Sequence, residues 1–130
     1  MREIKDQEHF NFIRDISPDE HGNLYICDPL NSRIHVLSNG GEYLRSFGCD
    51  GSGVNKLSAP CGIYVSSQYV YVTDSGNHTI SVYTTEGEHV TSFGQGGCNE
   101  GDFNRPRGVC VDKDGFVYVC DTDNTRVQVF

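Results

Sequence analysis

The sequence predicts an all-β fold made of repeated four-stranded units. A polar phrase recurs after three β-prone runs, and its aspartates are 46 and 47 residues apart. The phrase reads Asp28-Pro-Leu-Asn31-Ser-Arg33, then Asp74-Ser-Gly-Asn77-His-Thr79, then Asp121-Thr-Asp-Asn124-Thr-Arg126. A period of this length indicates an array of identical supersecondary units. Four short strands per unit are typical of a β-propeller blade. We therefore expect a partial β-propeller of about three four-stranded blades, the last one incomplete.

The middle unit is the most complete. Its β-prone runs are separated by turn residues and are expected to be strands at 62–65, 69–73, 79–83 and 89–93. The first unit offers comparable runs at 22–27, 33–37 and 42–47, and the third at 108–111, 115–120 and 126–130. Helical signals are nearly absent, and the one weak candidate is the stretch 3–12.

The repeat sets the expected domain organisation. Residues 1–12 are a lead-in, 13–56 form the first repeat, 57–102 the second, and 103–130 an incomplete third. Arg14-Asp15-Ile16 stands where the later units have Pro-x-Gly, so we expect the first unit to begin in a degenerate way. Because repeat units bury their faces against neighbours, we expect this chain to be a fragment of a longer propeller. A ring of two copies is the alternative.

Composition narrows the function classes. The 130 residues carry a formal net charge of −8, which argues against a surface that grips DNA phosphates. The amino terminus is polar, unlike a signal peptide, and no apolar run approaches a membrane span of ~20 residues. We expect a cytoplasmic protein that binds neither DNA nor membranes.

Six cysteines raise the question of disulfides or metal. They show no CxxC pair and no short spacing with histidine, so no metal site and no cofactor is expected. Cys27 and Cys120 occupy the same repeat slot directly before the aspartate. We interpret the cysteines as small packed hydrophobic residues.

The repeated aspartate is interpreted as scaffold. Its carboxylate can accept N–H groups of the turn that follows its strand. The asparagine three positions later tolerates a left-handed backbone, and the arginine two positions further can offset the aspartate charge. The signature set is Asp28, Asn31, Arg33, Asp74, Asn77, Asp121, Asn124 and Arg126, with Thr79 replacing the arginine in the middle unit.

The whole pattern resembles the NHL repeat. Pro106-Arg107-Gly108 leads into a β-prone run, Gly115-Phe-Val-Tyr-Val-Cys leads to Asp121, and Phe-Gly closes the first two units at 47–48 and 93–94. The repeats are similar in style to those of animal tripartite-motif proteins, whose NHL propeller follows RING, B-box and coiled-coil segments. That resemblance implies the partner-binding part of a ubiquitin ligase or a translational repressor. Any ligase activity would reside in a RING segment, which this chain lacks.

An enzymatic role is not expected. The histidines show no metal-type spacing, and no nucleophile elbow or phosphate-binding glycine loop occurs. We expect a non-catalytic recognition scaffold that binds a protein partner, with RNA binding as the alternative. Candidate contact residues are Lys56, Arg105 and Arg107 in or beside the connections between units, and Tyr64 as a stacking surface. The two glycine-rich connections have equal lengths, which favours a structural role for them. The remaining blades or a second copy would be needed for closure.

Overall fold

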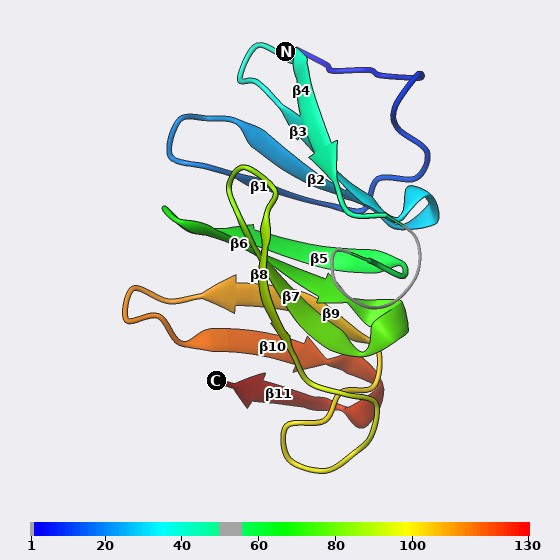
Figure 1. The fold of residues 1–130 in the computed structure, drawn as a ribbon, viewed down its shortest axis with the longest axis vertical. Helices are drawn as coiled ribbons and strands as arrows, with labels where there is room; N and C mark the ends of the chain where they lie inside the picture. The colour runs from blue at the N-terminus through cyan, green and yellow to red at the C-terminus, as the bar shows by residue number, and fades with distance from the viewer. Residues whose placement is uncertain (1, 50–55) are drawn as a thin grey trace.

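The computed structural model describes residues 2–49 and 56–130 (Figure 1). Three antiparallel sheets follow one another along the chain and lie side by side, with the two termini at opposite ends of the row. Each sheet is one blade, and its strands pair in chain order. The fold class expected from the sequence is confirmed at the level of the fold: this is an all-β, partial β-propeller with two four-stranded blades and a third blade of three strands.

Blade 1 consists of β1 (Asp15–Pro18), β2 (Leu24–Asp28), β3 (Arg33–Leu37) and β4 (Tyr43–Phe47), with the short 3-10 turn η1 (Pro29–Asn31) between β2 and β3. The departure from Pro-x-Gly at its start does not remove the first strand, because β1 pairs with β2 over four residues.

Blade 2 consists of β5 (Pro60–Val65), β6 (Tyr69–Asp74), β7 (Thr79–Thr84) and β8 (His89–Phe93), with η2 (Ser75–Asn77) between β6 and β7. In both complete blades the outermost strand joins in the same register. Phe47 lies opposite Ile34 in blade 1, and Phe93 lies opposite Ile80 in blade 2.

Blade 3 consists of β9 (Pro106–Val111), β10 (Val117–Asp121) and β11 (Arg126–Val129), with η3 (Thr122–Asn124) between β10 and β11. Its sheet order is β11-β10-β9, and no fourth strand follows within the described residues. The weak helix candidate at 3–12 was wrong. That stretch holds only a turn at 7–9, which is closed by the bond from the N–H of Phe10 to the carbonyl of Asp6, and its last residues bond to Asp28 of blade 1.

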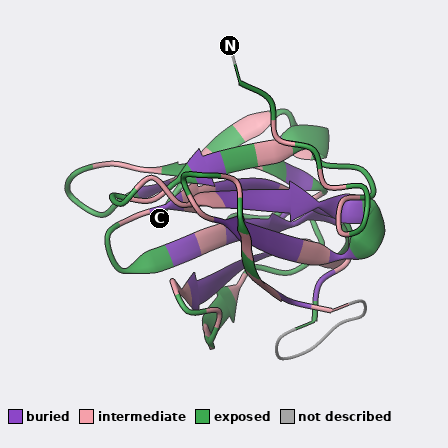
Figure 2. Ribbon diagram, turned by 90° about the horizontal axis from the view of Figure 1, so that it is seen from above, coloured by how far each residue is buried: buried purple, intermediate pink, exposed green. Residues whose placement is uncertain are grey.

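The core lies between the blades. We call the face of a blade that turns toward the next blade its forward face, and the opposite one its backward face. Strand alternation places apolar side chains on both faces. The first core cluster joins the forward face of blade 1 to the backward face of blade 2 (Figure 2). It holds Tyr25, Cys27, Ile34, Val36 and Phe47 from blade 1, and Ile63, Val65, Val70, Val72 and Tyr83 from blade 2, with Leu57.

A second cluster joins blade 2 to blade 3. Ile80 on the forward face of blade 2 packs with Val117 and Val119 on the backward face of blade 3 and with the fully buried Phe103. The inner strands β5 and β9 approach so closely that a Cβ at Gly62 would overlap the carbonyl oxygen of Arg107. Only glycine permits this approach, so blades 2 and 3 are packed backbone to backbone at that point.

Candidate functional site

A buried carboxylate ends the second strand of each blade, at what we call the turn end of the molecule. The turn end carries η1, η2 and η3, together with the connections that lead into β5 and β9. Asp28, Asp74 and Asp121 are all at most 1% exposed. A buried charge must find partners, so the atoms around each carboxylate define what this end can do.

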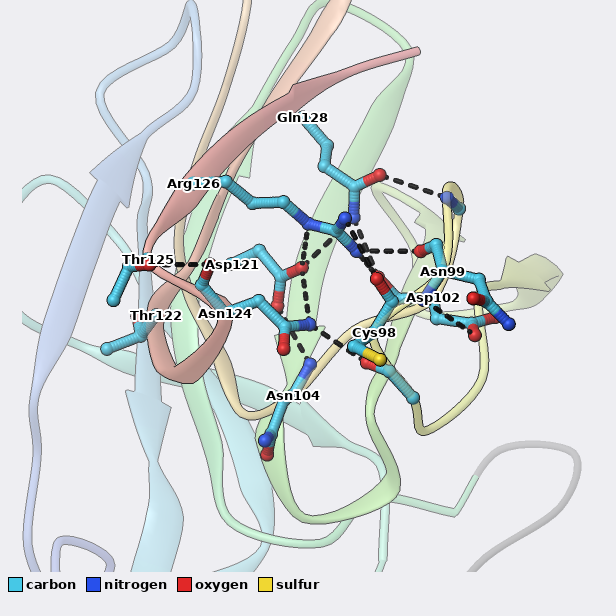
Figure 3. Close-up of polar contacts among 12 residues, drawn as sticks. Cys98, Asn99, Asp102, Asn104, Asp121, Thr122, Asn124, Thr125, Arg126 and Gln128 are labelled. Carbon is cyan, nitrogen blue, oxygen red and sulfur yellow. Dashed lines mark hydrogen bonds and ion pairs between the residues drawn. The ribbon is translucent and has the colours of Figure 1, made fainter.

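In blade 3 the carboxylate of Asp121 binds four donors (Figure 3). Its Oδ2 accepts hydrogen bonds from Arg126 Nε at 2.8 Å, Asn124 Nδ2 at 2.9 Å and Gln128 Nε2 at 3.1 Å. Its Oδ1 accepts the backbone N–H of Asn104 at 2.8 Å. The predicted ion pair between arginine and aspartate is therefore present in this blade.

The same arginine also holds the connection that precedes blade 3. Arg126 donates to the carbonyl oxygens of Cys98, Asn99 and Asp102, at 3.2, 2.7 and 2.8 Å (Figure 3). Asn124 donates to the carbonyl of Gly97 at 2.8 Å. The connection is therefore bonded to the scaffold, which fits the structural role inferred from its length. In the first connection, the positions that correspond to 97–99 are 51–53, and these lie outside the described residues.

In blade 1 a histidine takes the place of the arginine. Oδ2 of Asp28 lies 3.0 Å from Nε2 of His35, and Nδ1 of His35 lies 2.7 Å from the hydroxyl of Tyr43. The backbone N–H groups of Asn11 and Phe12 both donate to Asp28 at 2.8 Å. His35 is 1% exposed, so this chain of polar groups is internal to the blade.

In blade 2 neither the arginine nor the histidine is present. Asp74 accepts the backbone N–H of Ser58 at 2.7 Å and the side-chain amide of Asn77 at 2.8 Å. The slot of the arginine holds Thr79, and the slot of His35 holds Ser81, whose Oγ lies 3.1 Å from that of Ser92. Asp74 thus lacks the arginine or histidine contact that the other two aspartates have.

These partner sets separate the three carboxyl groups electrostatically. Burial raises the pKa of Asp74, and its bonds to Ser58 and Asn77 do not fully offset that effect. Burial also acts on Asp28, but the N–H groups of Phe12 and Asn11 and the contact with His35 outweigh it and lower the pKa of that group. The pKa of Asp121 is lowered as well, because Asn104, Asn124 and Arg126 outweigh its burial.

Three details of the predicted turn differ in the structure. The main-chain donors to Asp28 and Asp121 belong to the segment that enters the blade, 16 or 17 residues upstream, and not to the turn itself. The left-handed residue is the one after the asparagine, with φ of +50°, +56° and +52° at Ser32, His78 and Thr125. A third difference concerns Arg33, which donates to the Ser46 hydroxyl and the Gly48 carbonyl instead of Asp28.

The asparagine side chains of the three signatures donate hydrogen bonds to neighbouring groups. Asn77 and Asn124 each bond the aspartate three residues before them, whereas Asn31 donates to the carbonyl of His9 at 3.3 Å. The carbonyls of Ser58 and Asn104 in turn accept N–H groups from the turns, at Gly76 and Asp123. Each signature therefore fastens the turn to the segment that enters its own blade.

The four predicted contact residues are only partly brought together. Arg105 and Arg107 are exposed at the turn end, where Arg105 Nε lies 3.9 Å from the carboxylate of Asp123. Lys56 is exposed just before β5. Tyr64 does not join them, because it is half-buried and lies opposite Tyr71, four residues along β5 from Pro60, or about 13 Å.

A shallow pocket of about 230 Å³ lies where the inner strands begin. Arg14, Asp15, Cys61, Arg107 and Gly108 line it. Sequence reasoning had selected only Arg107 among these residues. The repeat could have found one more, because Cys61 and Arg107 occupy the same slot, 46 residues apart. Two guanidinium groups at one concave site favour an anionic or carbonyl-rich group.

The cysteines are only partly packed as predicted. Cys27 is buried, and burial raises the pKa of its thiol well above the ordinary value. Cys61 is half-buried, whereas Cys98, Cys110 and Cys120 are exposed, and all five are free thiols. Within residues 2–49 and 56–130 no cluster of metal-ligating side chains occurs, and no helix is long and apolar enough to span a membrane.

Comparison with known proteins supports the repeat assignment. The sequence model of the NHL repeat matches residues 103–130, which include the third aspartate signature. No curated protein matches the sequence closely enough to be reported as a relative.

Solved structures show the fold. A virginiamycin B lyase from Staphylococcus aureus is 17% identical with a TM-score of 0.71, and the match covers 99% of this chain and 44% of the lyase. An auxiliary nutrient binding protein from Bacteroides thetaiotaomicron is 22% identical with a TM-score of 0.67, over 88% of this chain and 36% of that one. Hydrazine synthase from Kuenenia stuttgartiensis is 14% identical with a TM-score of 0.62, over 98% and 38%. The chain spans less than half the length of each. Residues 103–130 thus match the NHL repeat, within a chain folded as a partial β-propeller.

Proposed function

We propose that this chain is a non-catalytic recognition scaffold that binds a protein partner at its turn end. The observation that carries the proposal is the pocket lined by Arg14 and Arg107 at the start of the inner strands. Neither guanidinium has an ion-pair partner among the described residues. Arg107 directly follows Pro106, which lies opposite the buried Asp121 in the sheet, so the backbone that carries this guanidinium is fixed before a partner binds.

The repeat style supports a more specific role. By its resemblance to animal tripartite-motif proteins, the scaffold would be the substrate- or partner-binding part of a cytoplasmic ubiquitin ligase, with the ligase chemistry on a separate segment. Virginiamycin B lyase, one of the similar structures, is by its name an enzyme. In this chain, however, His35 is enclosed and bonded on both ring nitrogens, and Nδ1 of His78 accepts the N–H of Arg105. These two imidazoles are thus engaged in the scaffold.

The test is a selection of peptides from a phage-displayed random library against the intact chain. We expect the selected peptides to bind at least about tenfold more weakly to the Arg107→Glu variant, as for a central interface charge. Lys113→Glu is the matched control, since Lys113 is exposed in the β9–β10 turn at the opposite end of the blade. Selected peptides that bind both variants equally would place recognition elsewhere.

RNA binding is the second candidate, favoured by the exposed Arg105 and Arg107 at one end. The net charge of −8 opposes it. Salt separates the two candidates, because RNA binding through several phosphates falls by orders of magnitude between about 50 and 200 mM salt. We expect a labelled single-stranded RNA to bind weakly and without dependence on Arg107. Tight, steeply salt-dependent binding that Arg107→Glu abolishes would favour RNA instead.

A further inference from the structure

A pocket of about 210 Å³ lies between blades 1 and 2, at the end of the molecule opposite the turn end. We call it the far-end pocket. The β1–β2 turn of blade 1 contributes to it, as do the β5–β6 and β7–β8 turns of blade 2. Tyr25 of β2 and Arg45 of β4 also line it. Both blades have all four strands, so this pocket does not result from a missing blade.

Arg45 joins the two blades at the far-end pocket. Its Nη2 donates to the carbonyl of Thr85 in blade 2 at 2.6 Å and to the hydroxyl of Tyr25 at 3.2 Å. That hydroxyl donates to the same carbonyl at 3.2 Å. Nε of Arg45, in contrast, is buried and has no hydrogen-bond partner among the described residues. A buried guanidinium N–H without an acceptor costs free energy, so this donor favours an acceptor from outside the chain.

The repeat does not require the charges at this pocket. Arg45 of β4 has the same register as Thr91 of β8, so a blade of this type forms without the arginine. Glu86 of the β7–β8 turn stands in the slot that Gly40 occupies in the β3–β4 turn, 46 residues earlier. The buried aspartates of the turn end, in contrast, recur in every blade. Arg45 and Glu86 therefore lie outside the repeated scaffold pattern.

Carboxylates outnumber the guanidinium at the far-end pocket. Asp19, Glu20 and Glu86 line it together with Arg45. Burial raises the pKa of Tyr25, and the negative charges of Asp19 and Glu86 add to that effect while Arg45 opposes it. The charges of both blades thus act on one hydroxyl group. Asp19 accepts two backbone N–H groups of its own turn, which leaves the two glutamates as the freer acceptors. An excess of carboxylates favours a ligand with a cationic group.

We propose that the far-end pocket binds a small zwitterion of the α-amino acid class, with its carboxylate on Arg45 and its ammonium group on Glu86 and Glu20. An α-amino acid carries a cation and an anion on one carbon atom, so it matches a site where a guanidinium and carboxylates line the same concavity. The volume also fits, because it is below the ~300–1,000 Å³ of pockets for drug-sized ligands.

The experiment is a titration of the intact chain with each of the common L-α-amino acids, followed by saturation-transfer NMR and calorimetry. We expect at least one of them to bind with a dissociation constant of about 1 mM or below. Two derivatives of that amino acid test the two charges. Its N-acetyl form lacks the ammonium group and its amide lacks the carboxylate, so each should bind at least about tenfold more weakly.

Substitutions locate the binding site. Arg45→Gln and Glu86→Gln should each weaken the binding of the amino acid by at least about tenfold. Glu88→Gln is the matched control, because Glu88 is exposed two residues after Glu86 and does not line the pocket. Far-UV circular dichroism reports folding. If Arg45→Gln unfolds the chain because the bond to Thr85 is lost, Glu86→Gln decides the question.

Three results would overturn the proposal. The first is that no amino acid binds at about 10 mM. The second is an amide that binds as tightly as its amino acid, which would indicate a site for cations alone. The third is binding that Glu86→Gln leaves unchanged. None of these results depends on Arg107 at the turn end, so the proposed partner site stands or falls separately.

Discussion

Arg126 joins the buried carboxylate of Asp121 to the connection that enters its own blade. Its Nε lies 2.8 Å from Asp121 Oδ2, and its Nη2 lies 2.8 Å from the carbonyl oxygen of Asp102. One side chain therefore holds a turn and a connection that are far apart in the sequence. Replacing it tests how much the aspartate signature contributes to stability.

Arg126→Met should lower the free energy of unfolding by about 2 kcal/mol, because it leaves a buried carboxylate with fewer donors and frees three carbonyls. Urea denaturation measures this loss. Arg33→Met is the matched control. Arg33 donates long hydrogen bonds to the hydroxyl of Ser46 and the carbonyl of Gly48, so we expect less than half the effect. Equal losses in the two variants would contradict the assignment of the arginine in blade 3.

Asparagine substitutions should distinguish the carboxylates of Asp121 and Asp74. Asp121→Asn removes the charge that pairs with Arg126, whereas Asp74→Asn removes a charge that burial already disfavours. We expect Asp121→Asn to cost more unfolding free energy at neutral pH than Asp74→Asn. Chemical denaturation of both variants at one pH gives the comparison, and the reverse order would show that the cation is unimportant.

The pH dependence of stability should follow the direction of each shift. Asp28 and Asp121 have lowered folded pKa values, so their contribution is present above the unfolded value of 3.8 and is lost as pH falls through the folded values. Asp74 has a raised folded pKa, so it works against stability as pH rises from 3.8 through that value. Unfolding free energies measured from neutral to acidic pH should fall most steeply below 3.8. Asp121→Asn should flatten that fall.

Gly94 should tolerate no side chain. It has φ of +93°, and a Cβ there would overlap the ring of Phe103, which is fully buried. We expect Gly94→Ala to cost about 3 kcal/mol, from left-handed backbone strain plus the steric conflict. Gly101→Ala is the matched control, because its φ is +85° but nothing lies within 4 Å of the added atom. It should cost only the backbone part, about 1 kcal/mol, by thermal or urea unfolding.

The sequence predicts the strands well because their signal is local. Alternating residues such as those of 79–83 and the spacing of the three aspartates are enough to define blades with ordered strands. The groups that bond those aspartates, by contrast, are distant from them in the sequence. Asn11, Ser58 and Asn104 reach the carboxylates from 16 or 17 residues upstream, through backbone N–H groups that any residue could supply.

Other parts of the site could not be predicted from the sequence for a related reason. His35 lies two residues beyond the arginine position of the repeat. Only the folded structure shows that His35 in blade 1 and Arg126 in blade 3 both contact the aspartate of their blade. Residues 2–12 carry no repeat signal. Their packing on His35 and Tyr43 depends on the folded blade and could not be predicted from the sequence. Tyr64 stays a predicted contact residue, but its distance from Arg105 and Arg107 follows from where β5 begins, which the sequence pattern does not fix.

Three identical carboxylates held by three different donor sets give the blades unequal responses to acid. Protonating Asp121 would weaken its ion pair with Arg126. Protonating Asp28 would weaken the bonds from the backbone N–H groups of Asn11 and Phe12. Asp74 accepts a proton more readily, because burial raises its pKa. Mild acidification would therefore titrate the middle of the row before its two ends. The three aspartate signatures have similar sequences, yet each loses its charge, and the bonds that depend on that charge, at a different pH.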